Sequence, residues 1–218
     1  MNDLAAGIIT CPINKDAINL AGCHFPGHTE LIAYLTDTKK FGMLLSGGYL
    51  KVLLATTHCA IKDVSKKLDI QKIEDIIKLA DYSLKKDFAI KKPRIAVLGL
   101  NPHNGENGLF GDEEIKIIAP AIENCKKQKI NVLGPFPADT LFPKVKQNFD
   151  CVVCMYHNQG LIPLKLLSFG YGVNITLGLP IVRTSVDHGT GYDIANQNKA
   201  NYTSLIQAAK LAKEIYIN

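Results

Sequence analysis

Short apolar runs alternate with amphipathic stretches along this chain, a pattern typical of strands and helices that follow one another. The apolar runs predict strands, the first of them buried, at residues 5–10, 41–46, 50–56, 94–100, 130–133, 151–155 and 173–177. Apolar residues at helical spacing predict helices at residues 28–35, 71–88, 112–129 and 203–217. Because the two alternate, we expect an α/β fold in which a mostly parallel sheet carries helices on both faces.

Three of the predicted strands are each followed closely by a histidine, namely His58, His103 and His157. If these strands are parallel neighbours, the histidines lie at one edge of the sheet, where open α/β sheets bind their ligands. Three imidazoles at such an edge would form an open divalent-metal site of the catalytic kind. The polar, glycine-rich loop at 101–111 either holds a ligand or is a solvated turn.

Composition narrows the class of protein. With 218 residues, 47% of them hydrophobic, the chain can bury a substantial core in one large or two small domains. The net charge is +5, but the lysines are scattered, which suits a small anionic ligand better than nucleic acid. The six cysteines lie in or beside apolar runs, and no signal-peptide pattern is present, so we expect reduced thiols in a cytoplasmic protein. No apolar run is long enough to span a membrane.

Several residues suggest anion binding. Arg183, one of only two arginines, lies in an apolar stretch and could bind a carboxylate or phosphate, or pair with a buried aspartate. Lys165 lies among leucines and could reach solvent, bind phosphate or transfer a proton. Thr29 begins a predicted helix, where it could cap the helix or help bind an anion. The loop at 187–193 ends in an acid but lacks the G-x-G-x-x-G pattern.

Seven segments together carry a family resemblance. They are GHTE (27–30), ATTH (55–58), GLNPH (99–103), GPFPADT (134–140), MYHNQG (155–160), VNITLGLP (173–180) and DHGT (187–190). In this order and spacing the chain resembles 4-hydroxythreonine-4-phosphate dehydrogenase of pyridoxal phosphate biosynthesis along essentially its whole length. The resemblance implies a fold like that of isocitrate and isopropylmalate dehydrogenases, with two lobes, one of them incomplete here.

The resemblance also implies an activity and a set of site residues. The activity is the NAD- and metal-dependent oxidation and decarboxylation of 4-phosphooxy-L-threonine to 3-amino-2-oxopropyl phosphate. One divalent metal per subunit, either zinc, cobalt or magnesium, would be held by His58, His103 and His157 at the interface of a homodimer, with ligands from both subunits. Substrate contacts would come from His28, Thr29, Lys165, Asn174 and Arg183. The adenosine half of NAD would be held by His188, Gly189, Thr190 and Asp193, and Lys165 and Asp139 are candidates for the general base.

Two departures from the family leave alternatives open. Asn158 stands where the family usually has aspartate, and an amide cannot act as a general base or an anionic partner for a metal ligand. Roughly the first third of the family's length is also absent. We therefore expect a metal-binding and dimerisation lobe at 1–165 and only the carboxyl-terminal part of the cofactor lobe at 166–218.

Two alternatives remain to the activity implied by the resemblance. One is a related dehydrogenase of threonate or erythronate phosphate. The other is an inactive module that binds metal or phosphate and dimerises.

Overall fold

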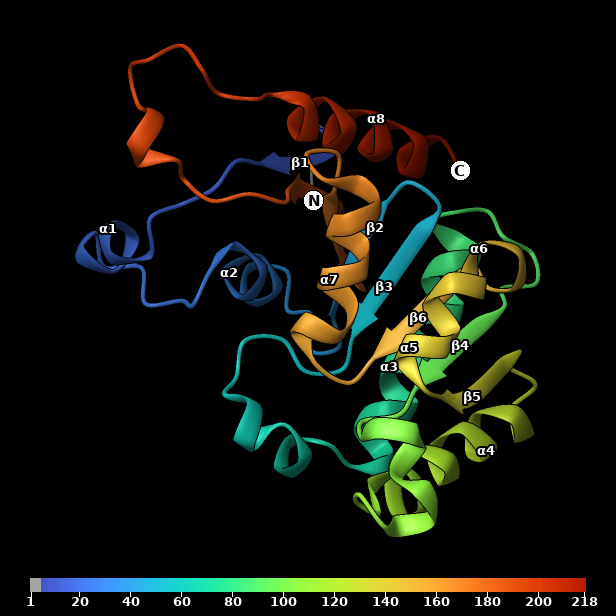
Figure 1. The fold of residues 1–218 in the computed structure, drawn as a ribbon. Helices are drawn as coiled ribbons and strands as arrows, with labels where there is room; N and C mark the ends of the chain where they lie inside the picture. The colour runs from blue at the N-terminus through green and yellow to red at the C-terminus, as the bar shows by residue number, and fades with distance from the viewer. Residues whose placement is uncertain (1–4) are drawn as a thin grey trace.

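The computed structural model describes residues 5–218, which form one eight-stranded sheet with helices on both faces (Figure 1). The strands are β1 (Gly7–Thr10), β2 (Gly42–Gly47), β3 (Leu50–Leu54), β4 (Ile95–Leu98), β5 (Val132–Phe136), β6 (Cys151–Cys154), β7 (Val173–Leu177) and β8 (Val182–Val186). The α-helices are α1 (Lys15–Leu20), α2 (His28–Leu35), α3 (Ile70–Lys86), α4 (Ala119–Lys127), α5 (Ala138–Leu141), α6 (Val145–Asn148), α7 (His157–Ser168) and α8 (Thr203–Ile217). The α/β class is therefore confirmed.

The sheet has the strand order β1-β8-β7-β2-β3-β6-β4-β5 and contains a parallel and an antiparallel part. The β3-β6, β6-β4, β4-β5 and β1-β8 pairs are parallel, whereas β2 pairs antiparallel with β3 and β7, and β7 with β8. The antiparallel part begins with a tight hairpin. Only Gly48 and Tyr49 join β2 to β3, and a connection that short cannot cross over to a parallel strand. Gly48 supplies the positive φ of 58° that such a turn needs.

The core occupies both faces of the sheet. On one face Ile73 and Ile77 of α3, with residues of α4 and α8, pack against the strands. On the other face Leu161 and Leu164 of α7 pack with residues of α5 and α6 (Figure 1). Gly160 lets α7 lie close to β6, because a Cβ there would be 2.9 Å from the Cys154 sulfur. The beginning of α7 therefore packs closely against the end of β6.

Some expectations about single elements were wrong. The first strand is not buried, since the side chains of Ile8 and Ile9 are 39% and 41% exposed; β1 lies at the edge of the sheet and pairs only with β8. The helix expected at 112–129 begins with a π-helical turn, Glu114–Ile118, before α4. Sequence reasoning also missed α1, α7 and β8. Pro163 within α7 and three consecutive polar residues in β8 hid these elements.

No helix in the described part of the chain is long and apolar enough to cross a membrane.

Candidate active site

The three strands that precede the histidines are adjacent and parallel in the sheet, as expected. Their order is β3-β6-β4, so His58, His157 and His103 follow neighbouring strands at one edge. This is the edge at which the carboxyl ends of parallel strands collect, and where open α/β sheets bind ligands. The topology therefore gives these three residues a common location that the sequence could only suggest.

Two of the three imidazoles lie close together. The ring centroids of His58 and His157 are 5.5 Å apart. Burial, and then the nearby His157 and Lys15, lower the pKa of His58, while Glu30 opposes this shift. The Nδ1 atom of His157 lies 2.8 Å from Oδ1 of Asn158. If Nδ1 carries the proton and donates it to this oxygen, Nε2 keeps a free lone pair of the kind that binds a metal ion.

His103 does not complete a metal-holding group with this pair in the described chain. No group of three His, Cys, Asp or Glu residues within 5–218 lies close enough to hold a metal ion. His103 belongs to the segment Pro102–Gly108 and is exposed in a cavity of about 270 Å³ that Asp139, Tyr156 and Gln159 also line. Imidazoles suit zinc or cobalt chemically, but within the described part of one chain the three do not form a group that could hold a metal ion.

Arg183 is held by hydroxyl groups. Its side chain on β8 is buried, with the residue only 4% exposed. It donates hydrogen bonds to Oγ1 of Thr10 (2.8 Å), Thr29 (3.3 Å) and Thr176 (3.0 Å). No carboxylate forms an ion pair with it among the described residues, and its Nε has no hydrogen-bond partner there. Burial lowers the pKa of Arg183 to about 10, so it stays charged at neutral pH.

The alternative of a buried Arg183–aspartate pair is therefore wrong for the described chain. A buried cation without a directly paired counterion is costly. Glu30 opposes part of the effect of burial on the pKa of Arg183 without forming an ion pair, and an anion placed beside the guanidinium would remove much of the remaining cost. The surroundings of Arg183 therefore favour the binding of a negatively charged group.

The other predicted substrate contacts lie around Arg183. Asn174 is two positions from Thr176 on β7 and so points to the same side of the sheet, and its buried Oδ1 has no hydrogen-bond partner among the described residues. Burial and the charge of Arg183 lower the pKa of His28 at the start of α2. Lys165 lies further along, with its Nζ 3.6 Å from Oδ1 of Asp187.

The predicted cofactor residues line a separate cavity of about 660 Å³. Its wall includes His188, Gly189 and Thr190. Lys165, one of the predicted substrate contacts, also lines this cavity. Asp187 lines the same cavity. Burial raises the pKa of Asp187, and Lys165 opposes this shift. Asp193 lies in the following turn, Tyr192–Ile194, outside the described lining.

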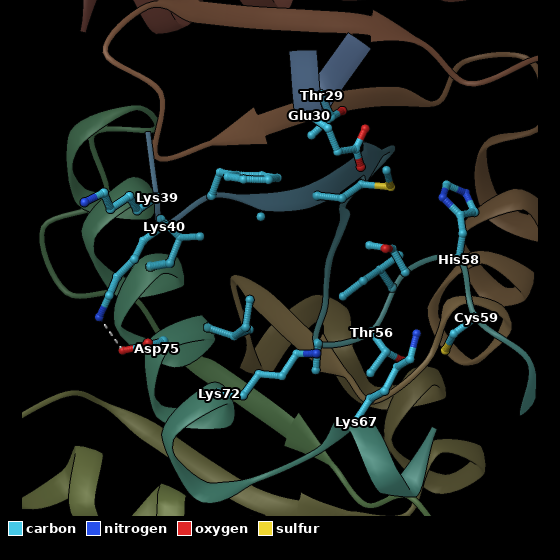
Figure 2. Close-up of a pocket in the computed structure, with 18 of the residues that line it drawn as sticks. Thr29, Glu30, Lys39, Lys40, Thr56, His58, Cys59, Lys67, Lys72 and Asp75 are labelled. Atoms are coloured by element: carbon cyan, nitrogen blue, oxygen red, sulfur yellow. Dashed lines mark hydrogen bonds and ion pairs between the residues drawn. The ribbon is translucent and has the colours of Figure 1, made fainter. Parts of the chain in front are cut away.

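A further cavity of about 490 Å³ lies between α2, the ends of β2 and β3, and α3 (Figure 2). Thr29 and His58 line it together with four lysines that the sequence analysis did not single out: Lys39, Lys40, Lys67 and Lys72. Lys40 forms an ion pair with Asp75 at 2.9 Å, drawn as a dashed line in Figure 2. These lysines come from two parts of the chain, 39–40 and 67–72, so no sequence signal marked the four as a group.

The fold places the chain in a known class. The structure of isocitrate dehydrogenase from Methylococcus capsulatus superposes on 94% of this chain and 67% of its own with a TM-score of 0.58 at 14% identity, which shows a shared fold. This agrees with the expected relation to the isocitrate and isopropylmalate dehydrogenase fold.

The family follows from closer matches. The pyridoxal phosphate biosynthetic protein PdxA family matches residues 1–212, and the chain belongs to this family. A 4-hydroxythreonine-4-phosphate dehydrogenase of Desulforapulum autotrophicum is 54% identical over 97% of this chain and 63% of its own length. A D-threonate 4-phosphate dehydrogenase of Salmonella typhimurium is 49% identical over 95% of this chain and 64% of its own length.

A solved structure supports the same assignment. The 4-hydroxythreonine-4-phosphate dehydrogenase of Klebsiella pneumoniae has a TM-score of 0.89 at 48% identity, covering 97% of this chain and 65% of that one. The chain thus spans slightly under two thirds of the length of these relatives.

Proposed function

We propose that this protein carries out the NAD- and metal-dependent oxidation of 4-phosphooxy-L-threonine, followed by decarboxylation to 3-amino-2-oxopropyl phosphate. The observation that carries the proposal is the buried guanidinium of Arg183, which has hydroxyl partners but forms no ion pair in the described chain. One of these partners, Thr29, also lines the cavity that contains His58. A doubly anionic phosphorylated amino acid supplies the missing negative charge. Membership of the PdxA family supports the choice of this substrate.

The metal site requires two copies of the chain in this proposal. His58 and His157 of one subunit would supply two ligands, since the centroids of their rings are only 5.5 Å apart. His103 would come from a second subunit, because the three histidines do not form a group that could hold a metal ion within the described part of one chain. A divalent metal bound there would act as a Lewis acid on the reacting oxygen. Zinc, cobalt and magnesium are the candidates.

The chain's own residues would bind and orient the substrate. Arg183 and Thr29 would hold one anionic end, with His28 and Asn174 beside them. Lys165 would neutralise charge at the boundary with the cofactor cavity, where His188, Gly189, Thr190 and, beyond them, Asp193 would hold the adenosine half of NAD. Fixing both ends in this way supplies part of the rate through orientation, while NAD takes up the hydride.

Lys165 and Asp139 are the candidates for the general base. Lys165 lines the predicted cofactor cavity, whereas Asp139 lines the cavity that contains His103. If His103 comes from a second subunit, Asp139 of that subunit comes with it, so both candidates meet at one composite site. Comparing turnover of Lys165→Met and Asp139→Asn separates them.

A homodimer follows from this arrangement, and we propose a cytoplasmic location. The six cysteines form no disulfide in the described part of the chain, which suits a reducing compartment. Residues 1–165 would form the metal-binding and dimerisation lobe and 166–218 part of the cofactor lobe. This boundary falls inside α7. In addition, β1 of the first lobe pairs with β8 of the second.

A second substrate is supported by one specific observation, the 49% identity to a D-threonate 4-phosphate dehydrogenase. Both substrates carry a phosphate and an oxidisable hydroxyl, so the same residues would serve. They differ in that 4-phosphooxy-L-threonine carries an amino group, which the threonate phosphate lacks.

The deciding experiment measures NADH absorbance with each substrate in turn, after calorimetric titration of the metal-loaded protein with NAD. A complete relative, such as the one from Klebsiella pneumoniae, is the positive control. Faster turnover of 4-phosphooxy-L-threonine supports our proposal, whereas faster turnover of the threonate phosphate assigns the second substrate. A folded, metal-loaded protein that binds no NAD refutes both and leaves a module that binds metal and anions.

A further inference from the structure

Glu114 is a buried carboxylate that lies against the loop carrying His103. It is 3% exposed and begins the helical segment that follows this loop. Its Oε1 accepts hydrogen bonds from the backbone N–H groups of Leu100 and Asn101, both at 2.7 Å. Its Oε2 accepts a third from Nδ2 of Asn101 at 3.0 Å. No lysine or arginine forms an ion pair with Glu114 in the described chain, so its partners there are N–H groups of this loop.

The loop adopts a backbone conformation that needs such support. Four non-glycine residues in Pro102–Gly108 have left-handed φ values: His103 (53°), Asn104 (56°), Glu106 (45°) and Asn107 (55°). Left-handed backbone costs roughly 1–2 kcal/mol per non-glycine residue, and it persists only where the surroundings hold it. Glu114 holds the start of this segment, and a hydrogen bond of 2.8 Å from Asn104 Nδ2 to the Pro135 carbonyl oxygen holds the middle.

The carboxylate also fits tightly between both ends of the loop. A Cβ at Gly99 would be 2.9 Å from Oε1 of Glu114, and one at Gly105 would be 2.8 Å from Oε2. Both distances are too short for a side chain, so these two glycines leave the space that the carboxylate occupies. A larger or smaller group at position 114 would therefore change the path of the loop on each side of His103.

We infer that Glu114 is a positioning residue for the third metal ligand: its carboxylate fixes the left-handed loop that presents the His103 imidazole. This inference rests on the proposed metal-binding role of His103. Without the carboxylate, two buried N–H groups lose their acceptor and the loop relaxes toward ordinary backbone conformations. The imidazole is then no longer preorganised, so part of the metal-binding energy is used to order the loop.

The test compares Glu114→Gln with Glu74→Gln. Glu74 is a matched control because it is also a buried carboxylate, 8% exposed, but it bonds Asn124 (2.7 Å) and Lys78 (2.9 Å) between α3 and α4, away from the loop. Each purified dimer is titrated with Co²⁺, and its visible absorption is recorded. We expect Glu114→Gln to weaken Co²⁺ binding by about 10- to 100-fold, the loss typical when a group that orients a metal ligand is removed. We expect Glu74→Gln to lower the melting temperature without changing Co²⁺ affinity.

A second measurement needs no metal. Amide hydrogen exchange at Leu100 and Asn101 in the metal-free protein should become faster in Glu114→Gln and stay unchanged in Glu74→Gln. If Glu114→Gln does not fold, Asn101→Ala removes the side-chain hydrogen bonds to Glu113 and Glu114 and keeps both backbone hydrogen bonds to Glu114. We expect it to show a smaller loss of Co²⁺ affinity.

Glu114→Gln is also combined with His103→Ala in a double variant. This variant separates failure of this inference from failure of the proposed function. If His103→Ala weakens Co²⁺ binding but Glu114→Gln stays within twofold of the parent protein, Glu114 has no positioning role and the metal site stands. If Glu114→Gln weakens binding equally with and without His103, it does not act through His103 and the inference is wrong. If His103→Ala leaves Co²⁺ affinity unchanged, the three-histidine site itself is wrong, and the inference with it.

Discussion

Replacing Arg183 with methionine should remove anion binding while leaving the fold nearly as stable as before. Burial lowers the pKa of this guanidinium from 12.5 to about 10, which corresponds to about 3 kcal/mol of destabilisation of the charged form in the folded state. Because the folded pKa is below the unfolded value, this penalty is present throughout the neutral range. Methionine removes it and fills much of the same space.

The substitution also removes three hydrogen bonds, to Thr10, Thr29 and Thr176. Each hydrogen bond from this charged group contributes about 1.5 kcal/mol net at the lower end of its range, or about 4.5 kcal/mol for the three. Removal of the charge penalty therefore offsets most of this loss, and we expect the free energy of unfolding to fall by about 1.5 kcal/mol. Urea unfolding followed by circular dichroism measures this, since the chain has no tryptophan.

Binding of the phosphorylated substrate should behave differently. A hydrogen bond from a charged group contributes about 1.5–3 kcal/mol, so losing it weakens binding by roughly 10- to 100-fold. Isothermal titration calorimetry measures this loss.

Arg94→Met is the matched control for Arg183→Met. Arg94, the chain's other arginine, forms an ion pair with Asp150 at 3.1 Å, and its side chain is 45% exposed. Its replacement should leave anion affinity unchanged. A loss of more than about 4 kcal/mol of stability in Arg183→Met, or anion affinity within threefold of the parent protein, would refute the reasoning.

Three other predictions address the remaining parts of the site. His103→Ala should abolish turnover and weaken metal binding, measured by NADH absorbance and by titration with Co²⁺, whereas His24→Ala, at an exposed histidine outside the site, should do neither. Unchanged activity with equal metal content in His103→Ala contradicts the metal site. Asn158→Asp should strengthen metal binding by roughly tenfold in calorimetry, because a carboxylate is a stronger acceptor for the imidazole Nδ1 than an amide; weaker binding contradicts this. Burial raises the pKa of Cys151 to about 12. Iodoacetamide at mildly alkaline pH should therefore label exposed Cys11 and spare Cys151 until urea is added, which mass spectrometry measures. Equal labelling of the two cysteines before urea is added contradicts the burial of Cys151.

The sequence by itself determined the features that depend on local periodicity. The helix bounds at 28–35 and 203–217 and the strand at 173–177 are those of α2, α8 and β7, because the spacing of apolar residues directly reports which face is buried. The common edge for the three histidines was also predictable. It needs only that the three preceding strands be parallel neighbours, and the apolar runs before them indicate buried strands of that kind.

Only the tertiary structure decided which side chains meet. Arg183 contacts Thr29 across 154 positions of the chain and Thr176 across the β7-β8 pair, and nothing in either segment specifies that register. The structure also shows that His58, His103 and His157 do not form a metal-holding group within the described chain, and it places the Glu114 carboxylate against the start of the His103 loop. Such contacts depend on how distant elements pack together, and packing is decided by the whole core rather than by any local pattern.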